Sequence, residues 1–219
     1  MTSNKNVFIN NELLVRSLVA MPNHLTLDSF QKLCEITSKA TTREVVDYLV
    51  NQGIGQLSDG SVVFSCKDKL ETILLAMSKG CDPERLSKKI QWKDFELFTS
   101  QLIESSGFSF ERNVVLTKPR IQIDVIGFYQ KTALLIDCKH WMKIHGFNIA
   151  KFSSNQIRRA EIFLEKRKGI DSAIPIIVTL YEYNCNFFDR VPIVPISKFK
   201  EFLQNFPFYL DRLHLIENN

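Results

Sequence analysis

The chain has 219 residues, 45% of them hydrophobic and 24% charged, and a formal net charge of +4. These values describe an ordinary globular protein with enough length for a sizeable core, and neither half is a polycation, so any nucleic-acid binding must come from local patches. No apolar run approaches the roughly 20 residues of a membrane span, and the polar amino terminus has no signal-peptide core. We therefore expect a cytoplasmic protein without a membrane partner. Five scattered cysteines without a C-x-x-C pair indicate neither structural zinc nor a disulfide framework.

Residues 1–90 combine helical patterns with one hairpin signal. Apolar residues at helical spacing predict helices over 10–20, 28–37 and 67–79. Thr41, with Glu44 three residues later, indicates a capping box that opens a further helix to Gln52, and Gly53 fits the C′ position that ends it. The Asp59-Gly60 pair predicts the turn of a two-stranded ribbon over 54–65.

This element order resembles a winged helix-turn-helix domain. In such a domain the helix over 42–52 is the recognition helix, and the hairpin turn at 58–60 is the tip of the wing. Lys39, Thr42 and Arg43 are then the residues expected to face DNA. These side chains are sparse for strong binding, so a packing or partner-docking role is an equal alternative.

Two apolar runs, 121–129 and 133–138, flank a polar bridge and predict neighbouring strands of a buried hairpin. Each carries a carboxylate, Asp124 in the first run and Asp137 in the second, and a buried carboxylate must be paired, protonated or bound to metal. Lys139 follows Asp137 by two residues, so both side chains point to one face of the strand. Two carboxylates beside a lysine suit Mg²⁺ bound together with a substrate phosphate.

The spacing Asp-x(12)-Asp-x-Lys resembles the active-site signature of the PD-(D/E)xK nuclease superfamily. Here the signature is Ile123-Asp124 followed by Asp137-Cys138-Lys139, with Ile123 in the place of the usual proline. A preceding helix with a Phe-Glu pair and the three strands after it are similar to the restriction-endonuclease-like branch that includes Mrr-type enzymes and archaeal Holliday-junction resolvases. The resemblance implies an α/β domain over 91–219, with an αβββαβ core and a mixed sheet.

The same resemblance implies roles for individual residues. Glu96, Asp124, Asp137 and the Cys138 carbonyl would hold Mg²⁺, with Mn²⁺ as a substitute. Lys139 would position or deprotonate the attacking water. Gln156, on the helix after the second active strand, would reach back to the site. Taken alone, Glu96 is a solvated helix carboxylate and Gln156 an ordinary polar helix residue.

Basic residues near this core are candidate DNA contacts. They are Lys118 and Arg120 at a turn, Lys151 shortly before a helix expected to begin at Ser154, and Arg158 and Arg159 on that helix. A solvated turn is an equal alternative for Lys118 and Arg120.

The remaining pattern predicts further elements of this half. The expected helices cover 92–106, 154–167 and 198–205, and the expected strands cover 108–116, 173–181 and 191–196. Ser197 is the expected cap of the last helix, and Cys138 is expected to face the core, opposite Asp137 and Lys139. The aromatic tail, Phe202, Phe206, Phe208 and Tyr209, is assigned to the core, with a docking surface as the alternative.

These observations lead to one hypothesis and three rivals. The hypothesis is a Mg²⁺-dependent DNA endonuclease of repair, recombination or restriction that acts as a homodimer. The rivals are a DNA-binding or assembly protein with an inert nuclease fold, a junction resolvase instead of a restriction-like duplex cutter, and an RNA-cleaving enzyme that works through side-chain acid–base chemistry without a metal.

Overall fold

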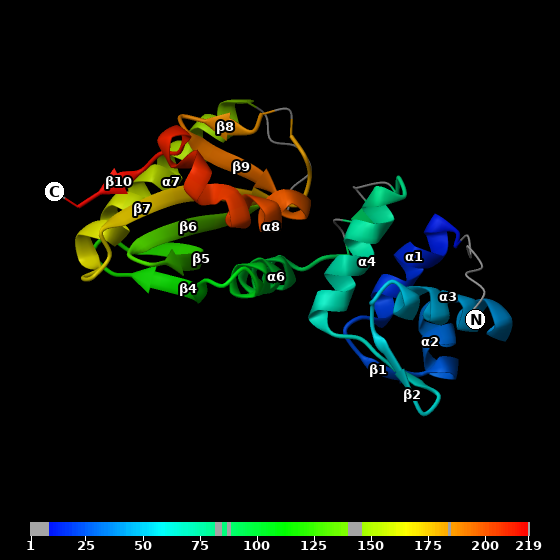
Figure 1. The fold of residues 1–219 in the computed structure, drawn as a ribbon. Coiled ribbons are helices and arrows are strands. Elements are labelled where there is room, and N and C mark those ends of the chain that lie inside the picture. Colours follow the sequence, from blue (N-terminus) through cyan, green and yellow to red (C-terminus); the bar gives the residue numbers. More distant parts are fainter. Residues whose placement is uncertain (1–8, 82–84, 87–88, 140–145, 184, 219) are drawn as a thin grey trace. The chain divides into compact units, whose positions relative to one another are not determined.

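The computed structural model separates the chain into two compact units, Met1–Gln91 and Trp92–Asn219. Each unit is described by itself (Figure 1). The described residues are 9–81, 85–86, 89–139, 146–183 and 185–218. No helix in this described part is both long and apolar enough to cross a membrane.

The first unit contains short helices and a small antiparallel sheet. Its elements are α1 (Asn11–Ser17), η1 (Leu18–Ala20), β1 (His24–Thr26), α2 (Leu27–Leu33), α3 (Lys39–Asn51), β2 (Gln56–Ser58), β3 (Ser61–Val63) and α4 (Cys66–Ser78). The sheet has the order β1-β3-β2. The predicted helices and ribbon are present. Strand β1 was not predicted, because it has only three residues and only one of them, Leu25, is partly buried.

The start of α3 differs from the expectation. Ser38, not Thr41, is the N-cap, and its Oγ accepts a hydrogen bond from the Thr41 amide at 3.3 Å. Serine is as good a cap as threonine, so the helix can begin directly after Ser38 and is almost one turn longer than a helix capped by Thr41. Thr42 lies on the buried face of α3: it is 2% exposed, and its Oγ1 donates to the Ser38 carbonyl oxygen at 2.9 Å. The prediction that Thr42 faces DNA is therefore wrong.

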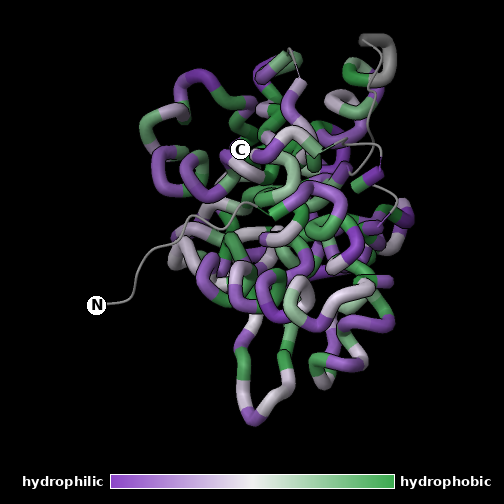
Figure 2. Tube along the Cα trace, turned by 90° about the vertical axis from the view of Figure 1, so that its right-hand side faces the viewer, coloured by the Kyte–Doolittle hydropathy of each residue, from purple (hydrophilic) through white to green (hydrophobic). Residues whose placement is uncertain are grey.

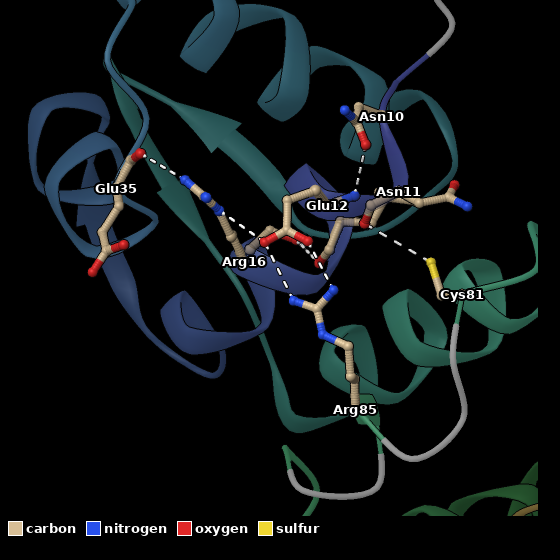
Figure 3. Close-up of polar contacts among 9 residues, drawn as sticks. Asn10, Asn11, Glu12, Arg16, Glu35, Cys81 and Arg85 are labelled. Atoms are coloured by element: carbon tan, nitrogen blue, oxygen red, sulfur yellow. Dashed lines mark hydrogen bonds and ion pairs between the residues drawn. The ribbon is translucent and has the colours of Figure 1, made fainter.

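A cluster of ion pairs connects α1 to the segment after α4 (Figure 3). The Glu12 carboxylate accepts hydrogen bonds from Arg85 at 2.9 Å and from Arg16 at 3.1 Å. These hydrogen bonds lower the pKa of Glu12. Arg16 also donates to the Glu35 carbonyl oxygen, and the Cys81 thiol donates to the Asn11 carbonyl oxygen. Because the charged groups are partly exposed, this cluster fixes positions and contributes little stability.

The β2–β3 hairpin is the loop at the bottom of Figure 2, with hydrophobic strand residues and a hydrophilic tip. It is attached to α4 through Asp68. One oxygen of Asp68 accepts from the Gly55 amide at 2.8 Å, and the other accepts from the Ser65 amide in the capping box that starts α4. One carboxylate therefore holds both the hairpin and the helix start.

The second unit is a mixed sheet with helices on both faces (Figure 1). Its elements are α6 (Trp92–Ser105), β4 (Ser109–Leu116), β5 (Ile121–Tyr129), β6 (Thr132–Lys139), α7 (Gly146–Lys166), β7 (Ser172–Thr179), β8 (Phe187–Phe188), β9 (Val191–Pro195), α8 (Ile196–Asn205), η2 (Phe206–Arg212) and β10 (Ile216–Glu217). The strand order is β4-β5-β6-β7-β9-β8, and β10 pairs with β7. The α/β class, the αβββαβ order and the mixed sheet are as predicted.

The pairing within this sheet follows from the connections. A tight turn joins β5 to β6, so these strands are antiparallel, whereas α7 joins β6 to β7 and makes them parallel. All eight side chains of β7 are buried, as expected of a strand covered on both faces. Ala160, Phe163 and Leu164 of α7 pack against one cluster of strand residues, which includes Ile123 and Leu135.

Neighbouring side chains of β6 show which helix covers which face. Asp137 contacts Arg159 of α7, whereas the Cys138 thiol lies 3.6 Å from Thr99 Oγ1 of α6. Successive side chains of a strand point to opposite faces, so α6 and α7 lie on opposite sides of the sheet. Cys138 faces the α6 side, and its position opposite Asp137 is as predicted.

Four details of the second unit depart from the expectations. Helix α7 starts eight residues earlier than Ser154, and α8 starts at Ile196 after Pro195, without a side-chain cap from Ser197. Strand β8 and strand β10 are too short to leave a periodic pattern. In the aromatic tail, Phe206 is buried but Phe208 is 80% exposed, so the core assignment is wrong for Phe208.

Replacing Asp68 tests its double role. Asp68→Ala should lower the free energy of unfolding by about 1–2 kcal/mol, because two backbone amides lose their acceptor. Hydrogen exchange at Gly55 and Ser65, together with thermal unfolding followed by circular dichroism, measures this effect. Asp47→Ala, which removes only the exposed pair with Arg43, is the control and should change stability by no more than about 0.5 kcal/mol. Equal effects of the two substitutions would contradict the account.

Candidate active site

The candidate site forms where the β5–β6 ladder ends. The last hydrogen-bonded register pair is Val125 with Ile136, and the next residues along the two strands are Asp124 and Asp137. Beyond that pair, the Cys138 amide donates to Asp124 Oδ2 at 2.9 Å. The Asp124 carboxylate thus takes the place of the backbone carbonyl that would accept this hydrogen bond if the β5–β6 ladder continued. The two strands can therefore separate at this edge.

Asp137 carries two cationic partners. Lys139 Nζ lies 2.8 Å from Asp137 Oδ2, and Arg159 Nη1 lies 3.0 Å from Oδ1. The Asp137 side chain is 4% exposed, and those of Lys139 and Arg159 are 15% and 31% exposed. A carboxylate this buried would be costly without such partners.

Gln156 holds the arginine in place from α7. The amide group of this buried residue donates to the Leu135 carbonyl oxygen at 2.7 Å, and its Oε1 accepts from Arg159 Nη1 at 3.1 Å. Within the described residues, Gln156 forms no hydrogen bond with Lys139 or with a carboxylate. It reaches the site as the sequence predicted, but its contact there is Arg159.

Arg159, a predicted DNA contact, pairs with Asp137 in the structure. The physical reason is its position three residues after Gln156, which places both side chains on the sheet-facing side of α7. Lys151 and Arg158 are exposed on the same helix, as a DNA-contact role requires.

Glu96 is buried in α6, with 2% of its surface exposed, which excludes the solvated alternative. Its Oε1 has no hydrogen-bond partner among the described residues. Burial, followed by the negative charge of Asp124, raises the pKa of Glu96 from 4.5 to about 7. The nearby positive charge of Arg112 acts in the opposite sense. Glu96 is thus within electrostatic reach of the two aspartates, and its buried Oε1 has no hydrogen bond from the described residues to stabilise the charged form.

Burial, together with the charge of Asp137, also raises the pKa of Asp124, while the Cys138 amide lowers it. Burial raises the pKa of the Cys138 thiol as well, so its sulfur remains protonated. The carboxylate oxygens, and not this sulfur, are therefore the chemically available ligands of the site.

Seven residues line a cavity of about 330 Å³ at this position, here called the carboxylate cavity. They are Trp92, Gln122, Asp124, Asp137, Cys138, Lys139 and Arg159. Trp92 and Gln122 were absent from the sequence-based set because a tryptophan at a helix start and an exposed strand glutamine have no motif.

The residues of the site match a hard divalent cation by donor chemistry. Asp124, Asp137 and Glu96 supply carboxylate oxygens, which Mg²⁺ prefers, and Glu96 Oε1 is a buried oxygen without a hydrogen bond. In the part of the chain that the structure describes, no three His, Cys, Asp or Glu groups already stand together at the spacing of a bound ion. Metal binding would therefore require these side chains to approach one another.

The other predicted DNA contacts lie outside this cavity. Lys118 and Arg120 are exposed in the β4–β5 turn, and Lys166 of α7 donates to the Lys118 carbonyl oxygen. In the first unit, Lys39 pairs with Asp28 and Arg43 pairs with Asp47, both at the surface.

Comparisons with known proteins leave the activity open. No protein-family model matches the chain. An uncharacterized protein of Archaeoglobus fulgidus is 27% identical over 129 residues, which cover 55% of this chain and 95% of that protein. Among solved structures, protein VC1899 from Vibrio cholerae has a TM-score of 0.38 at 12% identity, with 92% of this chain and 50% of that chain covered. The small subunit of the heterodimeric restriction endonuclease R.BspD6I has a TM-score of 0.37 at 17% identity, with 68% of this chain and 80% of that chain covered.

This chain thus spans half the length of VC1899. Similarities at these TM-scores assign neither a fold family nor an activity, so the function must be inferred from the site itself.

The raised pKa of Glu96 predicts a pH-dependent stability in the absence of metal. Between pH 4.5 and about 7 the folded protein keeps a proton that the unfolded chain has lost, so the free energy of unfolding falls as pH rises through this window. Glu96→Gln should remove this fall. Its free energy of unfolding at pH 8 should exceed that of the wild type by about 1–3 kcal/mol.

Urea unfolding in EDTA at pH 5 and pH 8 measures this difference. Glu104→Gln changes an exposed carboxylate of the same helix and should keep the wild-type pH dependence. Identical pH dependence in the wild type and Glu96→Gln would show that Glu96 is not a buried, unpaired carboxyl.

Proposed function

We propose that this chain is a Mg²⁺-dependent DNA endonuclease, with Mn²⁺ as a substitute. The observation that supports this proposal is the convergence of Asp124, Asp137 and Lys139 in one cavity, near a buried glutamate with one oxygen that receives no hydrogen bond from the described residues. Carboxylates from two adjacent strands, with a lysine on the same face as one of them, provide the groups needed for phosphodiester hydrolysis. We further propose the PD-(D/E)xK superfamily as the family of the second unit.

Asp124, Asp137 and Glu96 are the proposed metal ligands, with the Cys138 carbonyl oxygen as a further one. When bound, Mg²⁺ supplies Lewis acidity to a phosphate oxygen and to a water molecule. The remaining steps are assigned to side chains of this chain.

Lys139 is the proposed catalytic cation. Its ammonium group lies at the cavity wall, 2.8 Å from Asp137 and 5.3 Å from the centroid of the Phe152 ring. From this position it can hold the attacking water and stabilise negative charge on the phosphate. Asp137 orients the ammonium, Arg159 balances the charge of Asp137, and Gln156 positions Arg159.

Exposed basic residues of the second unit, Lys118, Arg120, Lys151 and Arg158, are proposed contacts for the DNA backbone. We propose a homodimer, because cutting two strands requires two sites. Lys39 and Arg43 of the first unit, whose winged-helix character is part of this proposal, are further candidate contacts for DNA.

The inert-fold alternative has one observation in its favour. Both oxygens of Asp137 already interact with cations, so this carboxylate is neutralised without a metal. A DNA-binding protein with an inert nuclease fold would show no heat of Mg²⁺ or Mn²⁺ binding in calorimetry. A nuclease would show binding that Asp124→Asn weakens.

Cleavage of a labelled panel tests the proposal. The panel contains a four-way junction, a flap, a single strand and a linear duplex, each with Mg²⁺, Mn²⁺ or EDTA. Asp137→Asn and Lys139→Ala should each reduce metal-dependent cleavage by about 100- to 1,000-fold or more, because the first weakens a proposed metal ligand and the second removes the cation beside the reacting phosphate.

The matched controls are Asp171→Asn and Lys131→Ala, which alter an exposed aspartate–lysine pair of the same unit and should cut normally. Normal cleavage by folded Asp137→Asn protein would remove the proposal. Cleavage of RNA that persists in EDTA would favour side-chain acid–base chemistry instead.

A further inference from the structure

An exposed tryptophan lies at the wall of the carboxylate cavity. Trp92 is the first residue of α6 and remains 44% exposed, although the same helix buries Phe95, Phe98 and Ile103. No other aromatic ring and no cation contacts its indole among the described residues. Tryptophan is usually well buried, and one with this exposure beside charged groups offers a free aromatic face to a ligand.

Gln122 lines the same cavity from β5. It is exposed and lies two residues before Asp124, so both side chains point to one face of the strand. Its amide has two donors and one acceptor oxygen. An aromatic face and an amide therefore lie next to the groups proposed to act on a phosphate.

We propose that Trp92 stacks on an unpaired nucleobase next to the phosphate held by Lys139, with Gln122 hydrogen-bonding to the edge of that base. The substrate class is then nucleic acid with an unpaired nucleotide at the cleavage position: a single strand, a flap or a junction branch. This inference rests on the proposed nuclease function and specifies its substrate.

The physical argument is the accessibility of base faces. In a regular duplex each base is covered on both faces by its neighbours, so an indole can stack only on a base that has left the stack. Aromatic side chains on basic surfaces bind single strands in this way, without sequence preference, because every base has an aromatic face. Lys139 and Arg159 provide the positive charge at the same cavity.

The test measures binding with a fluorescent base. Single-stranded oligonucleotides carrying one 2-aminopurine at successive positions, and the matching duplex, are titrated with full-length protein in EDTA, where metal-dependent cutting is absent. The wild type should quench 2-aminopurine in the single strand. Trp92→Ala should lose that quenching and bind the single strand about 5- to 100-fold more weakly, the range expected for one stacked base. Duplex affinity should change by less than about twofold.

Two variants serve as controls. Trp92→Phe keeps an aromatic face and should retain most of the quenching, even if Trp92→Ala does not fold. Phe187→Ala removes an aromatic side chain of equal exposure, 44%, from β8, outside the carboxylate cavity, and should behave as the wild type. The inference is overturned if Trp92→Ala binds the single strand as tightly as the wild type, or if it weakens single-strand and duplex binding equally.

Wild-type cleavage of the substrate panel separates the two proposals. If Trp92-dependent quenching occurs but no substrate is cut, the nuclease proposal fails and the stacking site stands. If the wild type cuts duplex DNA and Trp92→Ala cuts it equally well and quenches normally, the nuclease stands and the stacking inference fails.

Discussion

The buried charge of Asp137 is the constraint on which the rest of the candidate site depends. This carboxylate lies near the end of β6, directly after four buried residues, 133–136, where an unpaired negative charge would be expensive. Lys139 of the same strand forms an ion pair with it, and Arg159 of α7 forms a second one. Gln156 then ties Arg159 to the carbonyl oxygen of Leu135 in β6. The polar network thereby fixes the position of α7 on the sheet and aims the ammonium group into the cavity.

The other two carboxylates lack comparable compensation. Asp124 accepts one backbone hydrogen bond, and one oxygen of Glu96 accepts none from the described residues. Burial raises the pKa of both groups. A site with this charge distribution is costly when its carboxylates are ionised and would be stabilised by a divalent cation, which is the electrostatic basis of the proposed function.

The sequence predicts those features of the fold and site that depend on neighbouring residues, and not those that depend on contacts between distant segments. Strand β5 has the predicted bounds, and β6 differs by one residue at each end, because alternation and apolar content are local signals. The shared face of Asp137 and Lys139 follows from the two-residue period of a strand. The partnership of Arg159 with Asp137 depends on how α7 is rotated on the sheet, and no local pattern encodes that rotation. Thr42, by contrast, was misplaced although its spacing from Val45 and Leu49 puts it on the buried face of the helix.

Anomalous diffraction from crystals grown with Mn²⁺ tests the central claim most directly, because it locates the metal independently of any activity. The account predicts a manganese peak coordinated by oxygens of Asp124 and Asp137, with Glu96 moved toward it and Lys139 beside it. Crystals at millimolar Mn²⁺ with no peak at these carboxylates, and with Asp137 still held only by Lys139 and Arg159, would contradict the claim.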